Sequence, residues 1–142
     1  MKNKSVTFLY GQGLKKDFKQ LEKYFYVPKI DWNTWEVKIP KGTEILIGFS
    51  MGATLACEYC LTHKIEHLIL CSLMPGIETL KKIKAKNVIF LVGEEEGWTL
   101  SEVRRVYKTV KSKKSLVVIP KGRHDISGTY QKKLIETIEN IS

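Results

Sequence analysis

The chain has 142 residues, of which 43% are hydrophobic, and a formal net charge of +9. A chain of this length builds one substantial core, so we expect a single domain over residues 1–142. Its apolar runs are far shorter than the roughly 20 residues that a membrane-spanning helix needs, and its basic N-terminus lacks the pattern of a signal peptide. A cytoplasmic protein without a membrane span is therefore the default expectation.

The positive charge is carried almost entirely by lysine, since only three of the 24 basic residues are arginine. The lysines are scattered along the chain as short pairs. Specific recognition of nucleic acid relies more on arginine forks and aromatic platforms. We therefore interpret the charge as a solvated surface and expect no nucleic-acid partner, while a basic module that binds nucleic acid or an anionic surface is kept as an alternative.

Three cysteines, Cys57, Cys60 and Cys71, form an odd set in a chain long enough to fold without disulfides. We expect reduced thiols that pack as small hydrophobic residues. The spacing of Cys57 and Cys60 matches half of a metal-binding or redox motif. No second pair of ligands accompanies it, so we predict no metal.

Apolar, β-branched runs alternate with segments of helical period, a pattern that predicts an α/β protein: a three-layer sandwich with a mostly parallel sheet. Helices on both faces of the sheet would bury the runs on both sides. About six strands are expected, at residues 6–10, 26–30, 44–48, 67–71, 87–92 and 115–119.

Helical patterns lie between most of these runs. A capping box is predicted at Thr99–Glu102, and the long connection at 72–86 has room for a turn at Pro75–Gly76 and a short helix. The residues expected on buried helix faces are Leu14, Phe18, Leu21 and Phe25 in the first helix, Gly52, Ala53 and Ala56 in the second, Val103, Val106, Tyr107 and Val110 in the third, and Tyr130, Leu134, Ile138 and Ile141 in the last.

The segment Gly48–Gly52 has the pattern Gly-x-Ser-x-Gly, with Ser50 at its centre. It follows a buried strand and opens a helix of small residues. In this context a sharp turn lifts the serine hydroxyl above the sheet edge, where it can act as a nucleophile. The alternative role for Ser50 is that of an N-cap for the helix that follows.

A serine nucleophile needs a base, and that base needs an acid to orient it. His124 follows the last predicted strand and is the candidate base. Three candidates for the acid, Glu94, Glu95 and Glu96, follow the strand before it. Asp125 adjoins His124 in sequence, so we expect it to cap the last helix instead.

Through the segments 9–13, 48–52, 92–96 and 122–125, nearly the whole chain resembles the α/β-hydrolase superfamily. The order serine, acid, histidine is the order of that family. The resemblance implies a minimal α/β-hydrolase fold without a lid domain. It selects Glu96 as the acid and assigns the oxyanion-binding amides to Gln12 and Met51, with no metal or cofactor.

The resemblance implies a serine hydrolase that acts on a small-molecule ester or thioester. A scaffold protein that keeps the fold without turnover is the main alternative. A second alternative is a dinucleotide site, because Gly11-Gln12-Gly13 opens a helix and Asp31 follows 20 residues after Gly11, although the third glycine of that motif is missing. A homodimer formed through an edge strand is a further open possibility.

Overall fold

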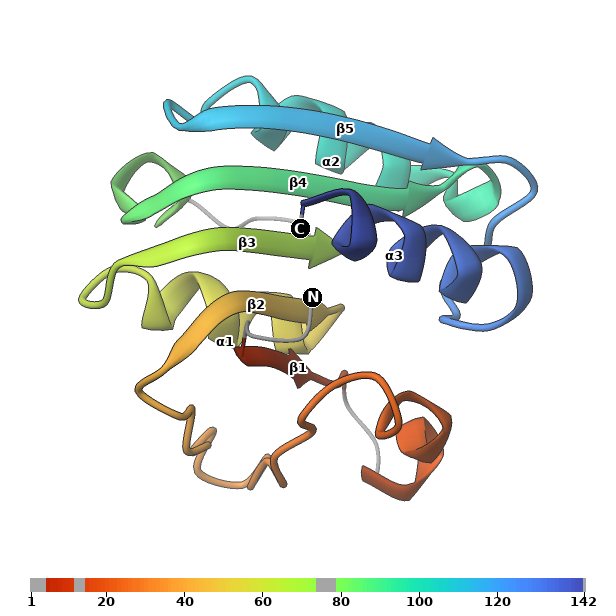
Figure 1. Cartoon of the computed structure of the whole chain (residues 1–142). Coiled ribbons are helices and arrows are strands. Elements are labelled where there is room, and N and C mark those ends of the chain that lie inside the picture. Colours follow the sequence, from red (N-terminus) through yellow and green to blue (C-terminus); the bar gives the residue numbers. More distant parts are fainter. Residues whose placement is uncertain (1–4, 12–14, 74–78, 142) are drawn as a thin grey trace.

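The computed structural model describes residues 5–11, 15–73 and 79–141. Its centre is a five-stranded parallel sheet with strand order β1-β2-β3-β4-β5 (Figure 1). The strands are β1 (Ser5–Leu9), β2 (Thr43–Phe49), β3 (Ile65–Cys71), β4 (Ala85–Gly93) and β5 (Lys113–Ile119). The helices are α1 (Met51–Tyr59), α2 (Trp98–Tyr107) and α3 (Gly128–Ile141), with 3₁₀ turns η1 (Lys15–Leu21), η2 (Thr79–Lys82) and η3 (Glu94–Glu96).

The helices cover both faces of the sheet. Figure 1 shows α3 on one face and α1 and α2 on the other. Because α1 begins with small residues, it can lie close to the strands it covers, and Gly52, Ala53 and Ala56 are all buried. The predicted α/β class and three-layer arrangement are confirmed.

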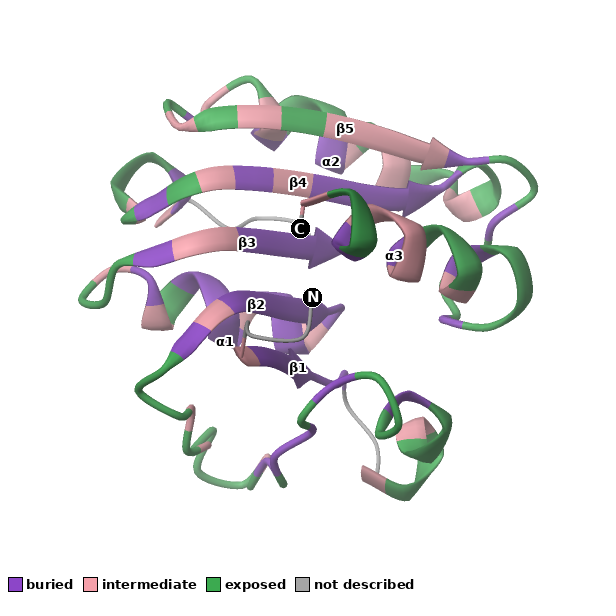
Figure 2. Ribbon diagram, in the orientation of Figure 1, coloured by how far each residue is buried: buried purple, intermediate pink, exposed green. Residues whose placement is uncertain are grey.

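The inner strands form the core of the molecule. Most of β2 and the carboxyl-terminal parts of β3 and β4 are buried (Figure 2). Continuous apolar runs such as Ile45–Ile47 have no solvent-facing side, as expected for parallel strands covered by helices. The edge strand β5 is only partly covered and carries lysines at its start.

The prediction of a sixth strand at residues 26–30 is wrong. Only Tyr26 pairs with the sheet, as an isolated bridge to Thr7 on the side of β1 away from β2. Pro28 has no N–H and cannot extend the hydrogen-bond ladder. The segment is held by side-chain contact instead, because the N–H of Ile30 donates to the buried Tyr10 hydroxyl at 2.6 Å.

Two helical predictions also need correction. The first helix is only the 3₁₀ turn η1, and its chain departs from helical geometry at Phe18; Leu14 lies outside the described residues. The predicted capping box at Thr99–Glu102 is wrong, because α2 begins one residue earlier, at Trp98. Glu102 instead pairs with Arg105 one turn along the helix, at 3.0 Å.

Cys57, Cys60 and Cys71 are all free and buried, as predicted. Burial raises the pKa of the Cys60 thiol to about 12 and raises those of the other two further. These thiols therefore remain protonated near neutrality and act as core residues.

Among the described helices, none has the length and apolar character needed to cross a bilayer.

Candidate active site

Parallel strands bring their following loops to one edge of the sheet. Ser50 follows β2, Glu96 ends η3 just after β4, and His124 lies in the loop after β5. The structure brings these three sequence-predicted residues together in one hydrogen-bonded line. His124 Nε2 lies 2.9 Å from Ser50 Oγ, and His124 Nδ1 lies 2.7 Å from Glu96 Oε1.

Ser50 occupies a strained turn between β2 and α1. Its φ of 57° and ψ of −119° lie in a region that non-glycine residues rarely adopt. Its N–H donates to the Cys71 carbonyl at 2.9 Å and so extends the β2–β3 ladder by one residue. The hydroxyl makes no capping bond to α1. Ser50 thus stands at the N-cap position of α1, but its hydroxyl contacts His124 and caps no amide of the helix.

This turn requires glycine at position 52. A Cβ at Gly52 would overlap the carbonyl oxygens of Leu9 and Tyr10 at the end of β1. The first turn of α1 therefore packs directly against the β1 main chain. That close approach places Ser50 beside Gly11, where an added Cβ would lie 3.2 Å from the Ser50 Cβ.

The protons in the Ser50–His124–Glu96 line can be assigned from the hydrogen bonds. The Glu96 carboxylate has only lone pairs to offer, so His124 Nδ1 must carry a hydrogen and donate it. Nε2 then keeps its lone pair and accepts the hydrogen of Ser50 Oγ. This tautomer is the one in which an imidazole can take a proton from serine.

The geometry distinguishes the three glutamates. Of these, Glu96 is the one in contact with His124. Glu94 Oε1 accepts the Lys121 N–H at 3.0 Å, and Glu95 lies 3.6 Å from the Arg123 guanidinium. Glu94 thus fastens the histidine loop to η3, while Glu95 makes only an exposed ion pair, and Glu96 alone of the three contacts the imidazole.

Asp125 has no direct contact with the imidazole among the interactions of the described residues. Its Oδ2 accepts a hydrogen bond from Ser127 Oγ at 2.8 Å, just before α3 begins. It therefore organises the entry to the last helix, and the adjacent position in sequence does not make it the partner of His124.

Glu96 is held as a buried carboxylate. Its side chain is 1% exposed, and its Oε2 accepts hydrogen bonds from Ser72 Oγ and from the Gly93 N–H, both at 2.6 Å. Burial on its own would raise the pKa of Glu96. The donors on His124, Ser72 and Gly93, together with the charge of His124, outweigh burial and hold this pKa below its usual value.

The lowered pKa of Glu96 predicts a pH-dependent stability. Below the ordinary pKa of 4.5, the Glu96 carboxylate is protonated in the unfolded chain but remains ionised in the folded chain. The free energy of unfolding therefore decreases as the pH is lowered, until the pH falls below the pKa of Glu96 in the folded protein. Urea unfolding from about pH 7 to about pH 3 should therefore show a steeper loss in the wild type than in Glu96→Gln. Glu139→Gln, at the exposed end of α3, is the control that should behave like the wild type.

Aromatic rings support the imidazole. The Phe49 ring lies 5.0 Å from that of His124, and Tyr130 packs edge-on against Phe49 at 6.5 Å. The imidazole has one packed face, yet the His124 side chain is 44% exposed. The imidazole is thus reachable from solvent, whereas Ser50 beneath it is 8% exposed.

Two predicted features of this edge are only partly described. Met51 is the first residue of α1, where the amide groups have no intrahelical partner. Gln12, the other predicted oxyanion donor, lies outside the described residues, as does the predicted turn at Pro75–Gly76. Within the described parts of the chain, no group of three His, Cys, Asp or Glu side chains is placed to hold a metal.

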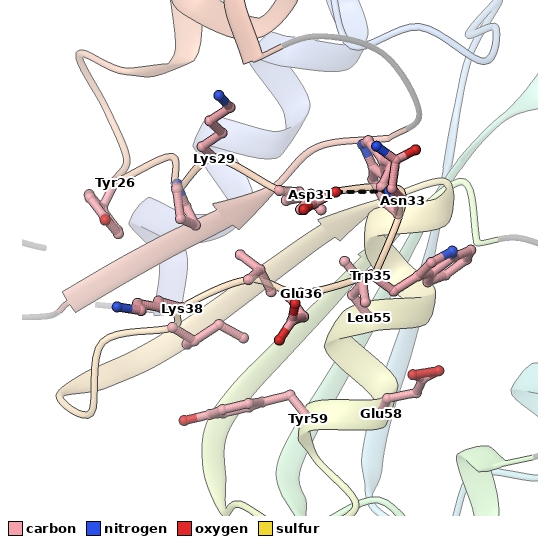
Figure 3. A pocket seen from close by; sticks show the side chains of 15 residues that line it. Tyr26, Lys29, Asp31, Asn33, Trp35, Glu36, Lys38, Leu55, Glu58 and Tyr59 are labelled. Carbon is pink, nitrogen blue, oxygen red and sulfur yellow. Dashed lines mark hydrogen bonds between the residues drawn. The ribbon is translucent and has the colours of Figure 1, made fainter.

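A groove lies elsewhere on the molecule, and Ser50, Glu96 and His124 are not among the residues that line it. It lies between the irregular segment 26–39 and α1, and Figure 3 shows Trp35 and Glu36 facing Glu58 and Tyr59 across it. Asp31, the candidate of the dinucleotide alternative, lies here and accepts the N–H of Asn33 in an exposed turn. Asp31 is thus part of a local turn beside this groove, while Gln12 and Gly13 of the dinucleotide alternative lie outside the described residues.

Sequence reasoning missed several residues that build this edge. Ser72 and Tyr130 connect to Glu96, and the only sequence signal for Ser72 is that it follows a buried strand, as Ser50 does. Gly93 and Gly122 belong to the segments that carry the resemblance, but their contact was not predicted: a Cβ on Gly93 would overlap the Gly122 main chain. This contact joins the acid loop to the histidine loop.

Comparison with protein-family models and with curated protein sequences finds no match. Solved structures do match over nearly the whole chain. A predicted CIB-like hydrolase from Thermoplasma acidophilum superposes with a TM-score of 0.71 at 12% identity, over 98% of this chain and 86% of that one. Esterase PE8 gives a TM-score of 0.73 at 16% identity, over 98% and 93% of the two chains.

A dienelactone hydrolase from Anabaena variabilis gives a TM-score of 0.68 at 13% identity, over 96% of this chain and 85% of that one. These likenesses, together with the parallel sheet and its turn at Ser50, show that the chain has the α/β-hydrolase fold. At 142 residues it is a small version of that fold.

Proposed function

We propose that this protein is a serine hydrolase that cleaves a carboxylic ester or thioester through an acyl-enzyme on Ser50. His124 serves as the general base and Glu96 as the acid that orients it. The observation that carries this proposal is the continuous line of hydrogen bonds from Glu96 through His124 to Ser50. The hydrolases and esterases with the same fold support the reaction class.

Acylation begins when Ser50 Oγ attacks the substrate carbonyl carbon. The hydroxyl proton passes to His124 Nε2, and the imidazolium that forms is stabilised by the Glu96 carboxylate. The carbonyl π electrons move to oxygen, giving a tetrahedral oxyanion. When that intermediate collapses, the bond to the leaving alcohol or thiol breaks, and His124 returns its proton to the leaving group.

The oxyanion needs preorganised donors where its charge develops. The N–H of Met51 follows the nucleophile directly and belongs to the unpaired amides at the start of α1. The Gln12 amide is the second proposed donor. Both are main-chain groups, so the site places no demand on these two side chains.

Deacylation repeats the sequence with water. His124 takes a proton from a water molecule, whose oxygen attacks the acyl carbon. Collapse of this second intermediate breaks the bond to Ser50 Oγ, which regains its proton from the imidazolium, and the carboxylic acid is released. An ester or thioester suits this site better than an amide, because an amine is the poorer leaving group.

Labelling with a fluorophosphonate probe, together with a panel of p-nitrophenyl esters of graded acyl length, tests this function. We expect one covalent adduct, mapped to Ser50, and hydrolysis whose chain-length dependence measures the acyl site. A folded protein that takes no label and hydrolyses none of the esters would favour the scaffold alternative. An adduct on another serine would contradict the assignment.

A further inference from the structure

Ser72 stands at the end of β3 in the same relation as Ser50 at the end of β2. Both follow the last residue of their strand, and both have a left-handed backbone, with φ of 48° and 57°. The N–H of Ser50 donates to Cys71 O, and that of Ser72 donates to Leu91 O at 2.7 Å. Each serine thus adds one hydrogen bond to the ladder of its strand. The chain then turns at that serine, at the carboxyl edge of the sheet.

The two hydroxyls differ in their surroundings. Ser72 is fully buried and donates its hydrogen to Glu96 Oε2 at 2.6 Å. Ser72 Oγ has already given its one hydrogen to Glu96, so it can only accept from Tyr130 O–H, which lies 2.7 Å away. The Tyr130 hydroxyl also lies 3.2 Å from the Leu91 carbonyl, and we assign its hydrogen to the shorter contact with Ser72. Tyr130 projects from α3, and burial raises its pKa well above the usual value, so it stays a neutral donor.

These contacts leave one carboxylate oxygen of Glu96 available to His124. Its Oε2 is taken by Ser72 and the Gly93 N–H, so Oε1 is the oxygen that faces His124. A glutamate carries one more methylene than aspartate and has an extra rotatable bond to restrain. The hydrogen-bonded pair Tyr130–Ser72 supplies that restraint, with Tyr130 reaching the edge from α3.

We propose that Ser72 is a positioning residue of the active site, which with Tyr130 behind it fixes the Glu96 carboxylate for the histidine. The effect of Ser72 on turnover rests on the proposed function. The effect of Ser72 on the position and pKa of Glu96 does not depend on turnover.

The decisive variants are Ser72→Ala and Ser72→Gly. Both remove the hydroxyl, but glycine adopts the left-handed backbone without strain, so Ser72→Gly separates the hydroxyl from the turn. We expect kcat to fall about 10- to 100-fold in both, the loss that corresponds to one hydrogen bond to a charged group, with KM little changed because Ser72 is buried. Tyr130→Phe should lose less, because the bond from Ser72 to Glu96 remains.

The second measurement is the titration of the Glu96 side-chain carboxyl carbon by ¹³C NMR. Loss of a donor to the charged form moves the midpoint to higher pH, so Ser72→Gly should titrate above the wild type. In a Glu96→Gln background, Ser72→Gly should cause no further loss of kcat. Ser101→Ala, on the exposed side of α2, is the control for both readouts.

An unchanged Glu96 midpoint in folded Ser72→Gly would overturn the proposal, and so would an unchanged kcat. If Ser72→Ala does not fold, Ser72→Gly and Tyr130→Phe still give both readouts. A wild-type protein without Ser50-dependent turnover would end the proposed function. The carboxyl titration would then decide by itself whether Ser72 holds Glu96.

Discussion

Ser50→Ala is expected to lower kcat for the preferred ester by about 10⁶-fold, the loss found when the nucleophile of a serine triad is removed. Alanine keeps the turn but has no oxygen to attack the carbonyl or to form an acyl-enzyme. Initial-rate kinetics and intact-mass analysis after fluorophosphonate treatment measure the effect. Ser101→Ala, which removes an exposed hydroxyl from α2, is the matched control and should keep wild-type rates.

Ser50→Gly gives the same test with a different consequence for stability. Ser50 holds a backbone conformation that costs a non-glycine residue about 1–3 kcal/mol, and glycine relieves most of that cost. We therefore expect an inactive protein that melts at a higher temperature than the wild type. Turnover that survives in either Ser50 variant would refute the acyl-enzyme mechanism.

Glu96→Gln is expected to lower kcat by about 10⁴-fold through the histidine tautomer. Ser72 Oγ and the Gly93 N–H both donate to one side of the residue, so the amide oxygen must take that place. The amide NH₂ then faces His124 Nδ1, which becomes an acceptor. The imidazole hydrogen moves to Nε2, and the base can no longer accept the serine proton.

Steady-state kinetics and the ¹⁵N shifts of His124 measure this effect together. The matched control is Glu95→Gln, which makes the same chemical change one residue away, where the side chain meets Arg123. It should leave kcat within about twofold, because exposed ion pairs contribute little. A Glu96→Gln protein that keeps its Nδ1–H tautomer and most of its activity would contradict the role given to Glu96.

Much of the fold could be predicted because five strands carry unbroken apolar runs. Runs such as Ile45–Ile47 and Val88–Val92 have no polar face, which indicates a sheet covered on both sides. The segment at Tyr26–Ile30 also carries β-branched and aromatic residues, but Pro28 interrupts its ladder and leaves a single bridge. Composition alone could not reveal how far the pairing would extend.

The capping box at Thr99–Glu102 shows a different limit. Local pattern favoured a helix start at Thr99, but Gly97, with a φ of 54°, turns the chain so that α2 already begins at Trp98. Where a helix begins depends on the direction from which the chain arrives. Here that direction is imposed by η3 and its contacts with the histidine loop.

The sequence by itself determined the residue types available for chemistry and their order along the chain: a serine after a buried strand, then glutamates, then a histidine. Only the tertiary structure decided that Glu96 faces the imidazole while Glu94 holds the loop and Glu95 points to Arg123, and that Ser72 and Tyr130 stand behind the carboxylate. The order of these residues is fixed by the covalent chain. The choice among neighbouring side chains depends on hydrogen-bond directions between segments that meet only after the sheet has formed.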